Sequence, residues 1–256
     1  MSGLSVQDVS VCYGARRVIE GLSLPELHAG EVTVLAGPNA AGKSTLLRAI
    51  AQLAPYQGRI GLGGEDLAWL AANRRAKVVG FMPQTLPSAS TLIVLESVIA
   101  ALRAGGQLGI HDAESRVLAV LERLGIADLA LERLEQLSGG QRQMVSLAQA
   151  IVRDPRLLLL DEPTSALDLA RQVRLLAELR RLAAEGRVVV AVLHDLGLAA
   201  RWADRIVVLE HGRLHASGAP EQVLTPAMLA QVYGVEARVE RCSMGRLTVM
   251  IDAERA

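Results

Sequence analysis

The fold is decided by the stretch Gly37-Pro38-Asn39-Ala40-Ala41-Gly42-Lys43-Ser44. It fits the phosphate-loop pattern G-x-x-x-x-G-K-S, and it lies between a strand-like apolar segment (31–36) and a segment with helical spacing (43–53). Glycines let such a loop curl with its N–H groups facing inward, and the start of the helix adds partial positive charge. Because a chance glycine-rich turn would rarely have both neighbours, the sequence predicts a phosphate-binding site.

Two side chains of this loop have the chemistry that a nucleotide requires. Lys43 is suited to neutralise the β- and γ-phosphates, and the Ser44 hydroxyl is suited to bind Mg²⁺. We expect the loop as a whole, together with the residue that follows it, to hold the nucleotide: Gly37, Pro38, Asn39, Ala40, Ala41, Gly42, Lys43, Ser44 and Thr45.

A pair of carboxylates stands at the end of a second apolar run. Residues 157–160 are all leucine, and Asp161 and Glu162 follow at once. A carboxylate at the end of a buried strand can hold Mg²⁺ directly or through water, and Glu162 can polarise an attacking water. An accidental acidic strand end would compete with this interpretation if the pair stood alone. Downstream of a phosphate loop, the pair predicts hydrolysis of a Mg-nucleotide.

The composition is that of a soluble protein with a large core. The chain has 256 residues, 51% of them hydrophobic, and 27 basic side chains balance 27 acidic ones. Neutral charge and 2% aromatic residues give no reason to expect nucleic acid as a partner. No uncharged apolar run approaches the ~20 residues of a membrane span, and no signal peptide is visible. Cys12 and Cys242 fit neither a disulfide framework nor a metal cluster, and we expect buried or neutral thiols.

The order of the remaining segments predicts a single α/β domain over residues 1–256. Apolar runs at 157–160 and 188–193, separated by an amphipathic helix at 168–185, are typical of a parallel sheet covered on both faces. Residues 85–137, approximately, are expected to form an inserted helical subdomain, and residues 220–256 a C-terminal appendage. Further strands are expected at 4–11, 77–82, 205–210, 213–217, 235–240 and 246–251, and further helices at 92–103, 112–124, 143–152 and 220–233.

The stretch Leu137-Ser138-Gly139-Gly140-Gln141-Arg142-Gln143 resembles the signature of ABC-type ATPases. Its residue types suit an anion-binding helix start, with the hydroxyl of Ser138 and the N–H groups of Gly139 and Gly140 facing a phosphate. A chain that already has one phosphate loop needs another nucleotide to fill this second site. The resemblance implies a head-to-tail homodimer, in which Ser138, Gly139, Gly140 and Gln141 of one subunit cap the ATP held by the other.

Other residues resemble elements of the same family. Tyr13 resembles the aromatic that stacks on adenine, although a core position at a strand end is an alternative. Gln84 resembles the glutamine that senses Mg²⁺ and water, and His194 resembles the histidine that contacts the γ-phosphate. The stretch 165–168 resembles the loop that crosses the dimer interface. The resemblance thus assigns catalysis to Glu162, His194 and Gln84, and the metal to Ser44, Gln84 and Asp161.

The resemblance also implies the fold, and it points to one residue of the phosphate loop that departs from the family pattern. The expected fold is an ABC ATPase cassette with a RecA-like core, an antiparallel β subdomain and the helical subdomain. The family usually has glycine where this sequence has Ala40. If that position needs φ > 0, alanine costs roughly 1 kcal/mol of strain.

A free-standing cassette with a short C-terminal extension is similar to the ATPase subunits of bacterial importers. The stretch 218–235 resembles the iron-siderophore, haem and cobalamin group. The implied partners are a second copy of the chain, two copies of a multi-span permease at the cytoplasmic face of the membrane and, indirectly, a periplasmic substrate-binding protein. A soluble ABC ATPase, as in iron–sulfur cluster assembly, is the alternative. The apolar stretch 92–101 could dock a permease helix or pack the subdomain, and we expect Trp69 and Trp202 to be packing residues.

Overall fold

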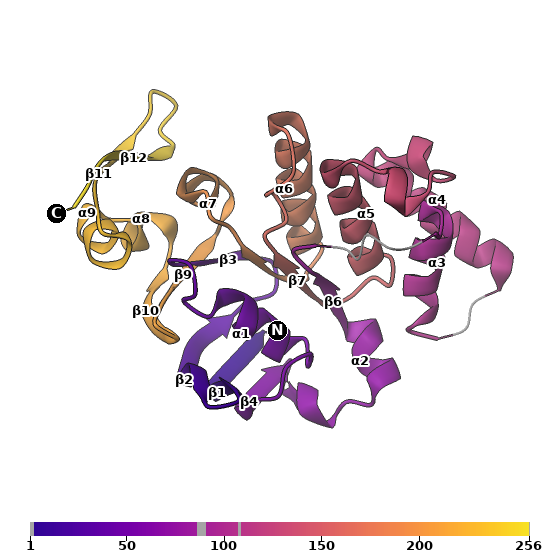
Figure 1. Ribbon diagram of the computed structural model, residues 1–256, viewed down its shortest axis with the longest axis horizontal. Coiled ribbons are helices and arrows are strands. Elements are labelled where there is room, and N and C mark those ends of the chain that lie inside the picture. Colours follow the sequence, from indigo (N-terminus) through magenta and orange to yellow (C-terminus); the bar gives the residue numbers. More distant parts are fainter. Residues whose placement is uncertain (1–2, 86–90, 107–108, 256) are drawn as a thin grey trace.

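A computed structural model describes residues 3–85, 91–106 and 109–255 of the chain. Two sheets of different kinds form its centre (Figure 1). The antiparallel sheet has the order β2 (Arg16–Leu27), β1 (Leu4–Tyr13), β4 (Gln57–Leu62) and β5 (Glu65–Asp66). The larger sheet has the order β10 (Arg213–Gly218), β9 (Arg205–Glu210), β3 (Val32–Ala36), β8 (Val188–Val192), β7 (Leu157–Asp161) and β6 (Val79–Met82). Its strands run parallel except for the edge strand β10.

The strands of the larger sheet are apolar throughout because each face has its own core. Leu157 and Leu159 of β7 pack with α1 (Lys43–Ile50) and the antiparallel sheet. Leu158 and Leu160 belong to the other core, formed with α5 (Gly139–Ile151), α6 (Leu169–Ala184) and α7 (Leu196–Trp202). In Figure 1 these three helices lie above the sheet, and α1 lies below it. The predicted parallel sheet with two covered faces is confirmed.

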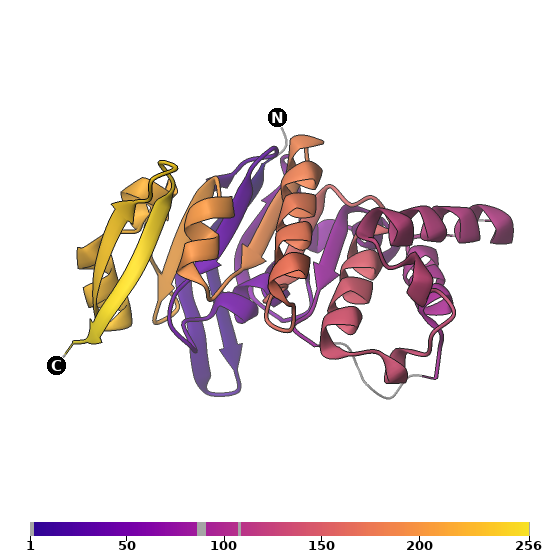
Figure 2. The same ribbon diagram turned by 90° about the horizontal axis from the view of Figure 1, so that it is seen from above.

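Two further groups of elements lie at the two ends of the molecule (Figures 1 and 2). Helices α3 (Val94–Arg103) and α4 (Ile110–Leu124) pack with α5 at one end, followed by the short turns η2 (Ala127–Leu129) and η3 (Leu134–Gln136). The opposite end carries α8 (Pro220–Val223), α9 (Pro226–Met228), η4 (Leu229–Tyr233) and the hairpin of β11 (Val235–Arg241) and β12 (Leu247–Glu254). Within the described ranges, no helix combines the length and the apolar character needed to cross a membrane.

Several sequence-based expectations were wrong in detail. The strand predicted at 77–82 begins only at Val79, because α2 (Ala72–Val78) occupies its first residues. The helix expected from residue 143 begins at Gly139, where Ser138 caps it. The helix predicted at 220–233 is broken where Thr225 caps a new turn. Strands β2 and β4 and helix α7 were not predicted. Part of the predicted helical subdomain, residues 86–90 and 107–108, lies outside the described residues.

Three side chains are more exposed than the sequence suggested. Trp69, at the end of the turn η1 (Leu67–Trp69), is 85% exposed and packs little, whereas Trp202 is partly buried and lies under the guanidinium groups of Arg180 and Arg201. Cys12 and Cys242 are both exposed, so burial does not explain these thiols.

The loop between β3 and α1 follows a path with several left-handed residues. Gly37 has φ 138°, and a Cβ atom there would lie 2.1 Å from the carbonyl oxygen of Leu209. Ala40 has φ 63°, in the region that strains any residue with a side chain. The suspected strain at Ala40 is therefore present, and the neighbouring β9 explains why Gly37 has no side chain.

We predict that Ala40→Gly leaves the loop intact. Glycine relieves the strain but adds freedom to the unfolded chain, so the free energy of unfolding should change by less than about 1 kcal/mol. Nucleotide affinity should stay the same or tighten by up to about fivefold, since at most ~1 kcal/mol is released. Urea unfolding and nucleotide titration measure both. Ala40→Val is the control, and its branched side chain should destabilise the protein. Clearly weaker nucleotide binding by Ala40→Gly would contradict φ > 0 at this position in solution.

Candidate active site

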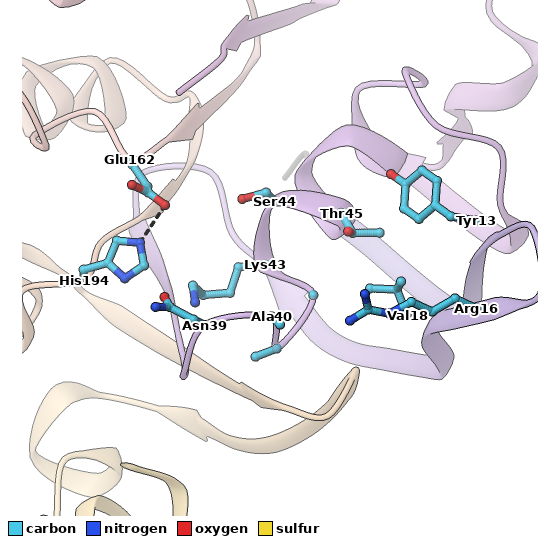
Figure 3. Close-up of a pocket in the computed structure, with 12 residues that line it drawn as sticks. Tyr13, Arg16, Val18, Asn39, Ala40, Lys43, Ser44, Thr45, Glu162 and His194 are labelled. Atoms are coloured by element: carbon cyan, nitrogen blue, oxygen red, sulfur yellow. Dashed lines mark ion pairs between the residues drawn. The ribbon is translucent and has the colours of Figure 1, made fainter. Parts of the chain in front are cut away.

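A hollow of about 450 Å³ opens where the two sheets meet the phosphate loop (Figure 3). The β1–β2 hairpin forms one side of it, and the ends of β7 and β8 form the other. Its lining consists of Tyr13, Arg16, Val18, Asn39, Ala40, Ala41, Gly42, Lys43, Ser44, Thr45, Glu162 and His194. The sequence analysis assigned most of these residues to one site, and the structure brings them together although they lie up to 181 positions apart in the chain.

The phosphate loop is arranged to receive an anion. Helix α1 begins after Gly42, which provides no side-chain cap for the first N–H groups of the helix. The Nζ atom of Lys43 donates to the carbonyl oxygens of Gly37 at 2.7 Å and Pro38 at 2.8 Å, which holds the loop closed around its own lysine. Burial lowers the pKa of Lys43, while the charges of Glu162 and Asp161 oppose that shift. A phosphate would give this buried ammonium group a stronger partner than two carbonyls.

Ser44 and Asp161 form a pair of oxygen ligands beside the loop. The Ser44 hydroxyl donates to Oδ1 of Asp161 at 2.8 Å, and the Asp161 side chain is buried at the end of β7. Burial raises the pKa of Asp161; the hydrogen bond from Ser44 opposes this, and the charge of Glu162 adds to it. A hydroxyl and a buried carboxylate suit Mg²⁺, which prefers oxygen ligands and relieves the cost of burying a negative charge.

The Glu162 carboxylate is held by groups from two separate segments. Nε2 of His194 lies 2.6 Å from its Oε1 (Figure 3). Nε2 of Gln84 donates to its Oε2 at 2.8 Å. The backbone of Glu162 has φ 53°, a conformation that a residue with a side chain adopts at a cost. Both carboxylate oxygens therefore point to defined partners, and the strained turn directs them over the hollow.

Gln143 is a residue of this site that the sequence reasoning missed. Its amide donates to the carbonyl oxygen of Glu162 at 2.7 Å and accepts the N–H of Ala166 at 2.9 Å. The buried side chain thereby ties helix α5 to the strained turn after β7. Gln143 is the last residue of the signature stretch 137–143, and its place in that motif was the feature of the sequence that could have indicated its role.

The signature residues lie apart from the hollow. Ser138 caps α5 by accepting the N–H of Gln141 at 3.3 Å, and its own N–H donates to Oε1 of Gln141 at 2.8 Å. Ser138 and Gly139 are exposed, and none of the four expected signature contacts belongs to the described lining. Gly140 is buried against the loop after β7, where a Cβ atom would meet the Ala166 oxygen at 2.9 Å. One chain therefore supplies most of the phosphate loop and Glu162 to its own hollow, but not the signature.

Tyr13 and Arg16 occupy the side of the hollow away from Glu162 (Figure 3). They are cross-strand partners at the tip of the β1–β2 hairpin, and Tyr13 is 46% exposed. This exposure rules out the alternative of a core tyrosine and leaves a ring face available for stacking. Arg16 was not predicted, because only pairing of the two strands places it opposite Tyr13.

Comparison with known proteins agrees with this geometry. A model of the ABC transporter family matches residues 20–165. The chain is 37% identical to "Hemin import ATP-binding protein HmuV" of Jannaschia sp. (strain CCS1), covering 97% of this chain and 93% of the relative. It is 40% identical to the HmuV protein of Pseudomonas putida, covering 93% and 94% respectively. It is 36% identical to "Iron(3+)-hydroxamate import ATP-binding protein FhuC" of Bacillus subtilis (strain 168), covering 93% and 90%.

Solved structures share the fold along nearly the whole chain. A metal-chelate type ABC transporter in an inward-facing conformation matches with a TM-score of 0.81 at 27% identity, covering 99% of this chain and 98% of that one. A bacterial ABC transporter cassette solved as a dimer matches with a TM-score of 0.77 at 28% identity, covering 85% and 98%. The expected cassette fold is confirmed, and the chain belongs to the ABC transporter family as an ATP-binding, ATP-hydrolysing subunit.

Proposed function

We propose that this chain powers the import of haem or a related iron chelate through a membrane permease. The observation that carries the proposal is likeness over almost the entire length to ATPases named for hemin and iron(3+)-hydroxamate import. The matching length includes the C-terminal segment, which the sequence already related to the iron-siderophore, haem and cobalamin group. A cluster-assembly ATPase is the weaker alternative, because the relatives described above are import proteins.

The chemistry assigned to the site is hydrolysis of ATP. Lys43 leaves its two carbonyl partners and binds the β- and γ-phosphates. Glu162 accepts a proton from a water molecule whose oxygen forms a bond to the γ-phosphorus, while the bond from that phosphorus to the β–γ bridging oxygen breaks. ADP and inorganic phosphate are the products. His194 and Gln84 already contact the Glu162 carboxylate, so they are placed to orient it and to contact the γ-phosphate and the water.

Ser44 and Asp161 would hold Mg²⁺. Gln84, which donates a hydrogen bond to the neighbouring Glu162, would lie close to the ion. When bound, the ion neutralises charge that develops on the phosphates. The hydrogen bond between Ser44 and Asp161 supports this assignment, because it keeps both oxygen ligands beside Lys43 before nucleotide binds.

The complete site requires a second copy of the chain. The exposed helix start at Ser138 and Gly139 presents N–H groups that the chain's own hollow does not use. A head-to-tail homodimer would place this helix start over the ATP of the partner. Each dimer would bind two copies of a multi-span permease at the cytoplasmic face of the membrane, and a periplasmic protein would deliver the substrate.

Only part of the stretch 92–101 is exposed and could contact a permease. The buried side chains of Val94 and Val98 pack inside the helical end, so much of the apolar excess is explained by the core. Leu92 remains 42% exposed, and Ala100 is exposed as well. We place the docking surface on this exposed part of the stretch.

We predict that Glu162→Gln binds Mg-ATP but hydrolyses it at least about a hundredfold more slowly. The amide keeps the shape and cannot accept the proton, and loss of a general base typically costs ~10²–10⁴ in rate. Gel filtration with ATP should then show an accumulated dimer. Hydrolysis at the parental rate would remove Glu162 from the role of base.

We predict that Ser138→Arg abolishes turnover while a single chain still binds nucleotide with nearly unchanged affinity. The bulky side chain blocks closure of the dimer, whereas the chain's own hollow lacks Ser138. Fluorescent-nucleotide binding and phosphate release measure the two effects separately. Glu122→Arg, at an exposed position of α4, is the control and should retain both. Equal loss of binding and turnover in Ser138→Arg would place the signature in its own chain's site.

We predict that Leu92→Glu and Ala100→Glu release the permease without weakening ATP binding, because a charge on the docking surface would have to be desolvated. Pull-down of the membrane subunit and a haem transport assay measure the effect. Leu118→Glu is a matched control, since this leucine of α4 is 39% exposed outside the stretch. If both variants keep their partner and their transport rate, the docking surface lies elsewhere.

A further inference from the structure

The C-terminal segment reaches the phosphate loop through one hydrogen bond. The backbone N–H of Gly37 donates to the hydroxyl oxygen of Tyr233 at 2.7 Å, across 196 residues of sequence. Tyr233 ends the π-helical turn η4, directly before the C-terminal hairpin. The phosphate loop is therefore supported by a part of the chain that lies beyond the sheet carrying it.

Both polar groups of Gly37 are engaged, and they have different partners. Lys43 binds its carbonyl oxygen, and Tyr233 binds its N–H. Gly37 is buried against the carbonyl of Leu209, which blocks approach from that side. A buried N–H without a partner is costly. Loss of the tyrosine hydroxyl would therefore favour conformations in which the Gly37 N–H is rotated away from its present position.

Tyr233 is itself held in place. Its ring packs against the core that contains Leu229 and Val232, and Gly234 with φ 66° ends the turn after it. Burial raises the pKa of Tyr233 to about 12, while the hydrogen bond from Gly37 opposes this shift. The hydroxyl therefore stays neutral at pH 7 and accepts the N–H.

We propose that Tyr233 is a positioning residue that holds Gly37, and with it the phosphate loop, in the conformation that receives ATP. The inference rests on the proposed nucleotide chemistry of this loop. When Lys43 leaves the Gly37 carbonyl for the phosphates, Gly37 loses one of the two side-chain hydrogen bonds that hold it. The Tyr233 hydroxyl then remains as the side-chain tie that keeps the start of the loop against β9.

This role affects nucleotide affinity more than turnover. Without the hydroxyl, part of the free protein adopts a loop that cannot bind, and the apparent affinity falls with the competent fraction. Saturating ATP shifts all of the protein back to the loop conformation that binds nucleotide. Tyr233 touches neither Glu162 nor His194 in the described structure, so the chemical step should proceed as before.

The test is Tyr233→Phe, which keeps the packed ring and removes only the hydroxyl. We expect the KM for ATP and the Kd for fluorescent ADP to rise about tenfold, as for one unpaired buried N–H group, with kcat within about twofold of the parent. Tyr56→Phe is the matched control, since its hydroxyl accepts a hydrogen bond from Gln52 outside the hollow. That control should change neither constant.

Amide hydrogen exchange measured by NMR tests the hydrogen bond without reference to activity. Exchange at Gly37 should become about tenfold faster in Tyr233→Phe, while exchange at Gly186, whose N–H donates to the Ala183 carbonyl outside the phosphate loop, should stay the same. Unchanged exchange at Gly37, or unchanged KM and Kd, would overturn the inference. A fall in kcat equal to the rise in KM would also overturn it. A parent protein that binds no nucleotide would instead refute the proposed function, and exchange at Gly37 would still decide the role of Tyr233.

Discussion

The arrangement of the whole site depends on the close approach of Gly37 to the carbonyl of Leu209. The two strands β3 and β9 run parallel side by side, and at Gly37, where the chain leaves β3, a Cβ atom would lie 2.1 Å from that oxygen. This contact forces the loop to turn at once and directs helix α1 into the space between the two sheets. Lys43, at the first position of α1, then points back at the loop carbonyls. The anion site is thus a consequence of backbone packing before any nucleotide is present.

The residues around Glu162 connect this loop to the rest of the molecule. His194 follows β8, Gln84 follows β6, and Glu162 follows β7 between them. The carboxyl ends of neighbouring parallel strands meet at one edge of the sheet, so side chains from distant positions converge there. Gln84 also precedes the helical end. A change in what Glu162 binds would therefore be felt at Gln84. This contact would be the physical basis of the coupling to a permease that we propose.

The sequence predicted the elements whose apolar pattern is regular and missed those whose pattern is not. Strands β7 and β8 are uninterrupted apolar runs, as burial on both faces requires. Strand β2 was not predicted because its buried residues do not alternate regularly with exposed ones. Register shifts in its pairing with β1 space them by three, two and three positions, at Ile19, Leu22, Leu24 and Leu27. Helix α7 is only seven residues long and follows His194 too closely for a periodic pattern to emerge.

The same distinction separates the predicted from the missed parts of the site. Lys43, Ser44, Asp161 and Glu162 were found because each lies in a contiguous motif whose residue types state their chemistry. Arg16, Gln143 and Tyr233 act through contacts made by tertiary folding: a cross-strand pair, a helix against a turn, and a C-terminal turn against a loop 196 residues away. Nothing local in the sequence distinguishes a tyrosine that accepts a buried N–H from one that packs in a core. The position of its hydroxyl depends on where the C-terminal segment lies, and that segment packs where it does because β12 covers α7, the helix that follows His194.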